Sequence, residues 1–432
     1  MVARRARGAL RRSGWLVGFC AAGVAVAGVA AIDCGGPDST PASLGDSGSD
    51  SQASPDTGVA DAAPVDGASD ASAAPDAPSA DGAADATPSD TSTSVSDAGT
   101  DSDTGLGPEP DGGIVSSCAA GGAGMTNCGN DGGESCCASW EVGGGTYDRS
   151  YEYDDAGSPT GEADPATVSS FRLDKYLVTV GRFRQFVNAL YPAGTAPDAG
   201  VAWTPSVGSG KHTHLNGGLG LAVVSTDDGG TTYEPGWTAS DDANVGPTNA
   251  KLGSCAPYST WTDSPGAQEN LPINCLEWAE AYAFCIWDGG FLPSEAEWEY
   301  AAAGGSEQRQ FPWGSTPPGT NNEYAIYSCY YGYTPAACYG FKNFAPVGTA
   351  SLGAGKWGQL DLAGEVWEWT LDSFGGAYPS PCTDCVAVSP TGDRVVRGGD
   401  IFSSALLLPS IRNSFPLSDY SEEVGFRCAR TP

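Results

Sequence analysis

The sequence predicts a mixed fold of short helices and strands, stapled by disulfides and preceded by a disordered acidic linker. Three observations support this prediction. The 432 residues include 61 Gly and 31 Pro, which favour loops over long regular elements. They also include 14 Cys, and so many cysteines indicate an oxidising compartment. Finally, the formal charge of −33 is distributed unevenly along the chain.

The overall composition excludes several classes of function. Fifty-three acidic residues against 20 basic ones leave no cationic surface for phosphates, so neither nucleic acid nor an anionic membrane surface is an expected partner. Two histidines exclude a three-His metal centre and leave little room for a catalytic base of the commonest type.

Residues 1–33 have the layout of a signal peptide. Five arginines precede an apolar run over residues 15–32. Cleavage after Ala31 would release the chain, whereas cleavage before Cys34 would allow that cysteine to be lipidated. An uncleaved membrane anchor is the third alternative, because the run approaches the length of a membrane span. Loss of Cys20 and lipidation of Cys34 would leave an even number of cysteines, which favours the lipoprotein.

Residues 34–113 are predicted to form a disordered linker. The stretch after Cys34 is mostly Asp, Ala, Ser, Pro, Thr and Gly, and it contains sixteen acidic residues but no basic or aromatic one. It cannot bury enough apolar surface to offset the entropy of ordering. Self-repulsion should keep it extended, as suits a tether.

Residues 114–136 are predicted to form a Cys- and Gly-rich collar in front of a domain over residues 137–432. The spacing of Cys118, Cys128, Cys136 and Cys137 does not supply the paired ligands of a zinc site, so disulfides are favoured. Further along, Cys329 with Cys338 and Cys382 with Cys385 are expected to be local bridges.

Three helices and two strands are predicted within the domain. Apolar side chains recur at i, i+3, i+4 and i+7 after a capping Thr179, which predicts a helix to about residue 190. A second helix is expected over residues 277–287. A third should begin at the capping box of Ser294 and Glu297 and end at residue 303. Buried strands are expected near residues 395–396 and 425–429.

Eight segments of the domain resemble one known family. They cover, in order, residues 171–179, 272–278, 292–300, 312–314, 345–348, 364–369, 397–399 and 425–428. Their order and content resemble the formylglycine-generating enzyme, or sulfatase-modifying factor, family. The resemblance implies a C-type-lectin-like α+β fold with few regular elements. It also implies a disulfide between Cys285 and Cys428, whose long loop would make it worth about 4–5 kcal/mol in the chain-entropy model.

The same resemblance identifies where catalysis would reside. Active members bind copper through two cysteines placed four and nine residues after the Arg-Gly-Gly motif, because soft thiolates hold Cu(I). Those positions are Ser403 and Leu408 here, and Asp400 stands where the family has Ser. A further cysteine pair of such enzymes is replaced at Ala302 and near Asn413. Copper is therefore not expected, and no catalytic residue is assigned.

A structural calcium site is the cofactor that the resemblance implies. The matching ligands are the side chains of Asp361 and Glu368 and the carbonyls of Gly364 and Val366, all oxygen donors as Ca²⁺ requires. Alternatively, Glu368 serves only to cap a turn. The family's second calcium site falls near Tyr339, which does not favour it.

Some relatives place a three-His iron centre on this fold, and His212 and His214 are the only candidates for it. A solvated His-x-His loop is the favoured interpretation of that pair.

Two functional classes therefore remain. The favoured one is an extracytoplasmic, non-catalytic module, lipid-anchored or secreted, that presents tryptophans to an unknown protein or glycan. Trp203, Trp237, Trp261 and Trp313 are the candidates, although each is more often a core residue. The alternative is an oxidase that converts a sulfatase cysteine to formylglycine.

Overall fold

The computed structural model describes residues 117–154, 158–191, 200–223, 231–333, 337–389, 391–403 and 407–432. The predicted signal peptide, Cys34 and the linker lie outside these residues. Among the described residues, no helix is long and apolar enough to cross a membrane.

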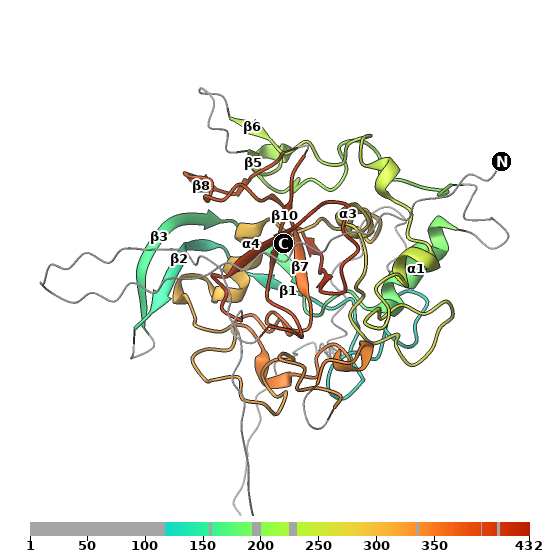
Figure 1. Cartoon of the computed structure of the whole chain (residues 1–432). Coiled ribbons are helices and arrows are strands. Elements are labelled where there is room, and N and C mark those ends of the chain that lie inside the picture. The colour runs from blue at the N-terminus through green and yellow to red at the C-terminus, as the bar shows by residue number, and fades with distance from the viewer. Residues whose placement is uncertain are drawn as a thin grey trace, which may run out of the picture. The chain divides into compact units, whose positions relative to one another are not determined.

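Short elements joined by long loops make up the domain, as the Gly and Pro content predicts (Figure 1). The α-helices are α1 (Val180–Leu190), α2 (Asn249–Leu252), α3 (Trp278–Trp287) and α4 (Glu295–Ala303). Single 3₁₀ turns are η2 (Asn216–Gly218), η3 (Asp242–Asn244), η4 (Gly305–Glu307), η5 (Phe341–Asn343) and η6 (Ser351–Gly353).

Four small sheets accompany these helices. The central one has the order β11-β10-β7-β12, from β11 (Arg412–Phe415), β10 (Arg394–Arg397), β7 (Trp367–Ser373) and β12 (Val424–Gly425). A second sheet comprises β1 (Ser139–Val142), β4 (Phe171–Asp174) and β13 (Ala429–Arg430). The third comprises β2 (Gly145–Tyr153), β3 (Pro159–Val168) and β8 (Cys382–Thr383). The fourth comprises β6 (Thr232–Tyr233), β5 (Ala222–Val223) and β9 (Cys385–Val386).

The three predicted helices are confirmed with their caps. Thr179 accepts from the backbone N–H of Arg182 at the start of α1. Ser294 and Glu297 form the capping box of α4, which ends at Gly304 in the left-handed conformation (φ 69°). α3 carries a capping box of its own, between Glu277 and Glu280.

The predicted strands are confirmed only in part. β10 covers residues 395–396, but residues 425–429 do not form one strand. The chain bends after β12, which pairs with β7 of the central sheet, and then forms β13, which pairs with β4 of the second sheet. That bend buries Phe426, Arg427 and Cys428 completely. The long hairpin of β2 and β3 was not predicted. Alternate residues of β2 are buried, and the matching alternation of Tyr147 and Tyr151 with polar residues is a signal in the sequence.

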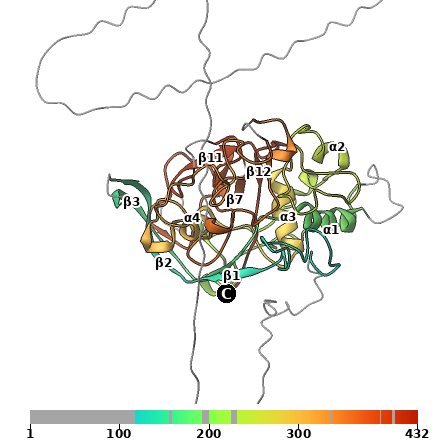
Figure 2. The ribbon, with the colours of Figure 1, turned by 90° about the horizontal axis from the view of Figure 1, so that it is seen from below.

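The main core lies between α1, α3 and the central sheet, which Figure 2 shows from a second direction. Phe183, Phe284 and Phe426 meet there, with ring centroids 5.4–6.2 Å apart. A disulfide between Cys285 and Cys428 joins α3 to the segment between β12 and β13. This pairing confirms the one implied by the resemblance.

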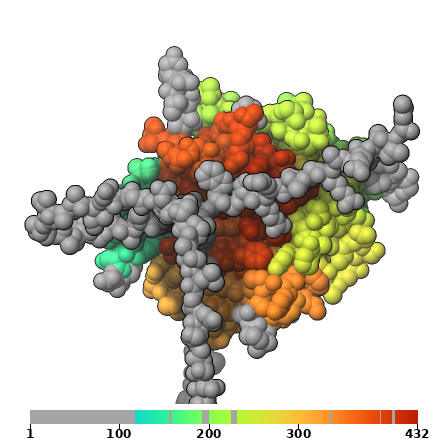
Figure 3. Space-filling view, in the orientation of Figure 1, coloured from blue at the N-terminus to red at the C-terminus, as the bar shows by residue number. Residues whose placement is uncertain are grey.

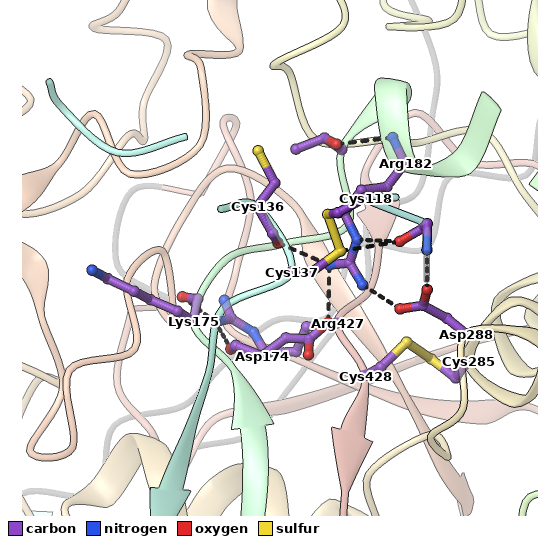
Figure 4. A network of polar contacts seen from close by, with 12 residues as sticks. Cys118, Cys136, Cys137, Asp174, Lys175, Arg182, Cys285, Asp288, Arg427 and Cys428 are labelled. Atoms are coloured by element: carbon purple, nitrogen blue, oxygen red, sulfur yellow. Dashed lines mark hydrogen bonds and ion pairs between the residues drawn. A yellow bond between two sulfur atoms is a disulfide. The ribbon is translucent and has the colours of Figure 1, made fainter. Parts of the chain in front are cut away.

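A buried polar network attaches the collar to the domain (Figure 4). The Arg182 guanidinium lies between the carboxylates of Asp174 and Asp288, at 3.0 and 2.8 Å. It also donates to the Ser117 hydroxyl (2.9 Å), while the Ser117 backbone N–H donates to Asp288 (2.6 Å). Burial alone would raise the pKa of Asp288, but Arg182 and Arg430 hold it below its ordinary value. The collar is therefore packed onto α1 and the end of α3.

Candidate functional site

The loop after β10 contains Ser403 and Leu408, the two positions at which the family resemblance implies copper-binding cysteines. Arg397, the last residue of β10, is fully buried and forms ion pairs with Glu295 (2.7 Å) and Glu299 (2.6 Å) of α4. Gly398 follows with φ 100°, and a Cβ there would lie 3.2 Å from the Trp298 ring. The Arg-Gly-Gly motif thus fixes where the loop starts.

Within this loop, Ser403 is hydrogen-bonded to the nearby Asp400. The Asp400 carboxylate accepts from the Ser403 hydroxyl (2.6 Å) and from the backbone N–H groups of Ser403 (2.8 Å) and Phe402 (3.2 Å). Burial raises the pKa of Asp400, while these hydrogen bonds oppose the shift. Ser403 is 7% exposed, so its hydroxyl is tied to Asp400 in a closed turn. Leu408, at the second copper position, is partly buried.

No thiolate is available in the part of the chain that the structure describes. All twelve of its cysteines form disulfides. The pairs are Cys118–Cys137, Cys128–Cys136, Cys255–Cys275, Cys285–Cys428, Cys329–Cys338 and Cys382–Cys385. The collar bridges and both local bridges are confirmed. The Cys255–Cys275 bridge was not predicted: Cys275 lies in the segment 272–278, but Cys255 lies outside the eight segments and nothing in the sequence pairs the two.

Aromatic side chains flank the loop after β10. Phe311 stacks on Trp313 at 5.0 Å between ring centroids, and Trp313 lies 5.5 Å from Tyr324. Tyr327 and Tyr330 meet edge to face at 5.3 Å. Leu407 joins this group in a small apolar cluster, and the Ser328 N–H donates to the Ser403 carbonyl (3.1 Å). We call these five rings (Phe311, Trp313, Tyr324, Tyr327 and Tyr330) the aromatic cluster.

The four tryptophans predicted to form a contact surface differ in their burial. Trp237 is fully buried and Trp261 is 6% exposed, so both are core residues and cannot contact a ligand. Trp203 is half-buried and packs against Phe186. Trp313 alone of the four belongs to the aromatic cluster. The density of rings over residues 311–333 is the sequence signal that could have revealed the rest of that cluster.

The predicted calcium ligands lie together on the segment that enters β7. Asp361 is buried with φ 56°, and one carboxylate oxygen accepts from the Gly348 N–H (2.6 Å) while Oδ1 has no hydrogen-bond partner. Burial raises the pKa of Asp361 to about 6. Glu368 is bound by Arg427 at 2.7 and 2.8 Å, one hydrogen bond to each oxygen, so its role is larger than the capping of a turn.

Side chains alone do not form a metal cluster anywhere in the described residues, since none brings three His, Cys, Asp or Glu groups together. The predicted calcium set needs only two carboxylates, because Gly364 and Val366 would contribute carbonyl oxygens. The buried, unpartnered Oδ1 of Asp361 fits a hard cation. Both oxygens of Glu368 accept from Arg427, so this carboxylate is less available to a metal ion.

The prediction of a solvated His212 is wrong. His212 is fully buried, and its Nδ1 lies 3.0 Å from Glu234 while its Nε2 lies 3.0 Å from Glu297. Burial would lower the pKa of His212, but the two carboxylates raise it to about 10, so it is a bound imidazolium. His214 is half-buried against Phe291, and burial lowers its pKa. His212 is thus bound to the start of α4 through Glu297, which has this second role besides capping the helix.

The family model for the sulfatase-modifying factor enzyme 1-like domain matches residues 132–432. The chain belongs to that family. A formylglycine-generating enzyme of Thermomonospora curvata is 30% identical over 306 residues, which cover 67% of this chain and 92% of the enzyme. An inactive Cα-formylglycine-generating enzyme 2 of Mus musculus is 31% identical over 169 residues, or 37% of this chain and 49% of that protein.

Among solved structures, PvdO from Pseudomonas aeruginosa aligns with 68% of this chain and 94% of its own, at 19% identity and a TM-score of 0.42. Membership of the sulfatase-modifying-factor family accounts for the sparse α+β architecture. The six disulfides indicate an extracytoplasmic or secretory compartment. Family membership alone does not decide activity, because the family includes proteins named both active and inactive.

Proposed function

We propose that this protein is a non-catalytic member of the sulfatase-modifying-factor family that binds a protein or glycan ligand outside the cytoplasm. One observation supports the proposal: Asp400 holds Ser403 in a closed turn, at a position where the family resemblance implies a copper-binding thiolate. A serine hydroxyl is a hard, weak ligand, and Leu408 offers no donor, so soft-metal binding has no basis there.

The aromatic cluster is the proposed contact surface. It lies beside the loop after β10, and four of its rings are only partly buried. Flat rings with polar edges give large contact area at low entropic cost, which suits both sugar rings and peptide side chains. Figure 3 shows one face of the domain, with the C-terminal segments in red beside the orange segments that contain residues 311–345.

An array of glycans and peptides, probed with the purified chain, tests this proposal. A specific hit should weaken at least tenfold in Trp313→Ala. Trp140→Ala is the matched control, because Trp140 is 39% exposed on β1 and outside the cluster. Equal binding by the Trp313→Ala variant, or equal loss in both variants, would contradict the assignment of this surface.

Structural calcium is a second part of the proposal. Asp361 and Glu368 with the carbonyls of Gly364 and Val366 would hold it, and the unpartnered Oδ1 of Asp361 supports this. At a calcium concentration 100 times Kd, chelation should cost about 2.7 kcal/mol of unfolding free energy. Asp361→Ala should abolish that response. A wild-type stability that does not change on chelation would refute calcium binding.

Anchoring through Cys34 is the third part, and it would place the domain at the end of the acidic linker. An oxidising compartment and the even number of remaining cysteines support it. Metabolic labelling with a radioactive fatty acid should mark the wild-type chain and not Cys34→Ser. Release of both into the medium without label would favour free secretion instead.

A further inference from the structure

A cavity of about 250 Å³ lies between α3, the strands β7 and β10, and the loop after β6. Trp278 and Tyr282, one helical turn apart on α3, line it together with the aliphatic side chains of Leu371, Val388 and Leu417. Its volume exceeds the roughly 150 Å³ that holds one benzene ring and is below that of drug-sized sites. The cavity therefore suits a ligand somewhat larger than one ring.

Arg394, the first residue of β10, is the cationic group in this cavity. It is 7% exposed, and its guanidinium carbon lies 4.0 Å from the centroid of the Trp278 ring. It donates to the Ser373 hydroxyl (2.6 Å) and to the carbonyls of Leu371 (3.2 Å) and Ser389 (3.4 Å), while its Nε has no acceptor. Burial lowers the pKa of Arg394 to about 10, so it stays charged at neutral pH.

Most of the other buried arginines have a carboxylate partner that Arg394 lacks; Arg149, which donates to backbone carbonyls, is the exception among the described residues. Arg182, Arg397 and Arg427 each pair with at least one buried carboxylate. Arg394 forms no direct ion pair with a carboxylate of the described residues; Asp372 and Asp241 act on its charge only at longer range. A buried cation without a direct counter-ion is unfavourable, because its lost hydration is not replaced. An anionic ligand would supply the missing partner.

We propose that this cavity binds a small organic monoanion, with its carboxylate at Arg394 and an aromatic or branched apolar body against Trp278 and Tyr282. The inference does not depend on the proposed function, since Arg394 begins β10 and the loop with Ser403 follows its other end. It names a ligand class rather than the protein or glycan of the outer surface.

Two acidic residues in the cavity wall limit the ligand to one negative charge. Glu234 is matched by the His212 imidazolium, which lies 3.0 Å away. Asp241 accepts from the hydroxyl and N–H of Thr238 and forms no direct ion pair among the described residues, although its charge acts on Arg394 at longer range. Asp241 should therefore repel a second carboxylate on the ligand.

Calorimetric titration with phenylacetate tests the proposal, with phenylacetamide and homophthalate as the neutral and dianionic probes. Phenylacetate should bind at least tenfold more tightly than either, because charge-assisted hydrogen bonds are the stronger ones. Arg394→Gln should reduce phenylacetate affinity at least tenfold, and Arg172→Gln, outside the cavity, should not change it. Asp241→Asn should raise phenylacetate affinity several-fold.

Three results would overturn the proposal: no phenylacetate binding, equal affinity for the acid and the amide, or a fall in affinity in Asp241→Asn. If Arg394→Gln fails to fold, the probe series and the Asp241→Asn variant still decide the question, because both use folded protein with Arg394 in place.

Discussion

The buried arginine–carboxylate pairs and the loop after β10 differ sharply, although Arg397 connects them. Arg182, Arg397 and Arg427 retain carboxylate partners that hold helices and strands together. Asp400, three residues after Arg397, forms a closed turn with Ser403, at one of the two positions where the family resemblance implies a copper-binding cysteine. Under the proposed function, the Arg-Gly-Gly motif preserves the scaffold of the family without its chemistry.

Disulfides offer the largest test of the scaffold. Cys285→Ser with Cys428→Ser opens a bridge that spans 143 residues, and the chain-entropy model gives a loss of about 5 kcal/mol in unfolding free energy. The matched control is Cys382→Ser with Cys385→Ser, whose separation of 3 residues predicts a loss of about 2 kcal/mol. Urea denaturation of both variants checks this, and equal losses would contradict the assigned scaffold role.

Arg427 provides the next test. Arg427→Met leaves Glu368 as an unpaired buried charge, so unfolding free energy should fall by about 3–5 kcal/mol. Lys356→Met breaks an ion pair with Glu307 at the surface and should cost at most about 1 kcal/mol. A similar loss of unfolding free energy in the two variants would contradict the stabilising role of the buried Arg427–Glu368 pair.

Buried carboxylates without a cation should show the opposite pH dependence from those with one. Burial and the neighbouring Glu277 raise the pKa of Glu280 to about 8. The folded state then holds a proton that the unfolded state releases, so this contribution to stability falls as pH rises from about 4.5 to 8. Glu280→Gln should reduce the fall in unfolding free energy between pH 5 and pH 8 by about 1–3 kcal/mol. Denaturation of both proteins at the two pH values measures this difference.

Glu307→Gln is the control for that pH series, because Glu307 is half-exposed and its pKa is lowered by hydrogen bonds from Lys356 and Arg309. It should leave the fall in stability between pH 5 and pH 8 unchanged. If the wild-type stability instead rises over this range and Glu280→Gln has no effect, the predicted pH dependence of buried carboxylates without a cation is contradicted.

Local signals in the sequence predict much of the scaffold. Capping residues such as Thr179 and Ser294 act within one helical turn, so their helices could be identified without tertiary information. The bridge of Cys285 with Cys428 came from family resemblance, since connectivity cannot be deduced from spacing. Both are confirmed by the structure.

Long-range pairing explains what the sequence could not predict. His212 contacts Glu297 across 85 residues, and no local pattern reveals that a His-x-His loop is buried between two carboxylates. The same holds for the cavity at Arg394, whose walls come from α3, β7, β10 and separate loops. At the candidate site, Ser403 and Leu408 could be identified by counting from Gly399, but the turn closed by Asp400 required the structure.

The most direct test of the central claim is turnover of a Cys-x-Pro-x-Arg peptide by the purified chain with Cu(I) and O₂. Mass spectrometry would detect conversion of the peptide cysteine to formylglycine, with the Thermomonospora curvata enzyme as the positive control. We expect no conversion above copper alone, because positions 403 and 408 hold serine and leucine instead of a thiolate. Conversion above that background would contradict it.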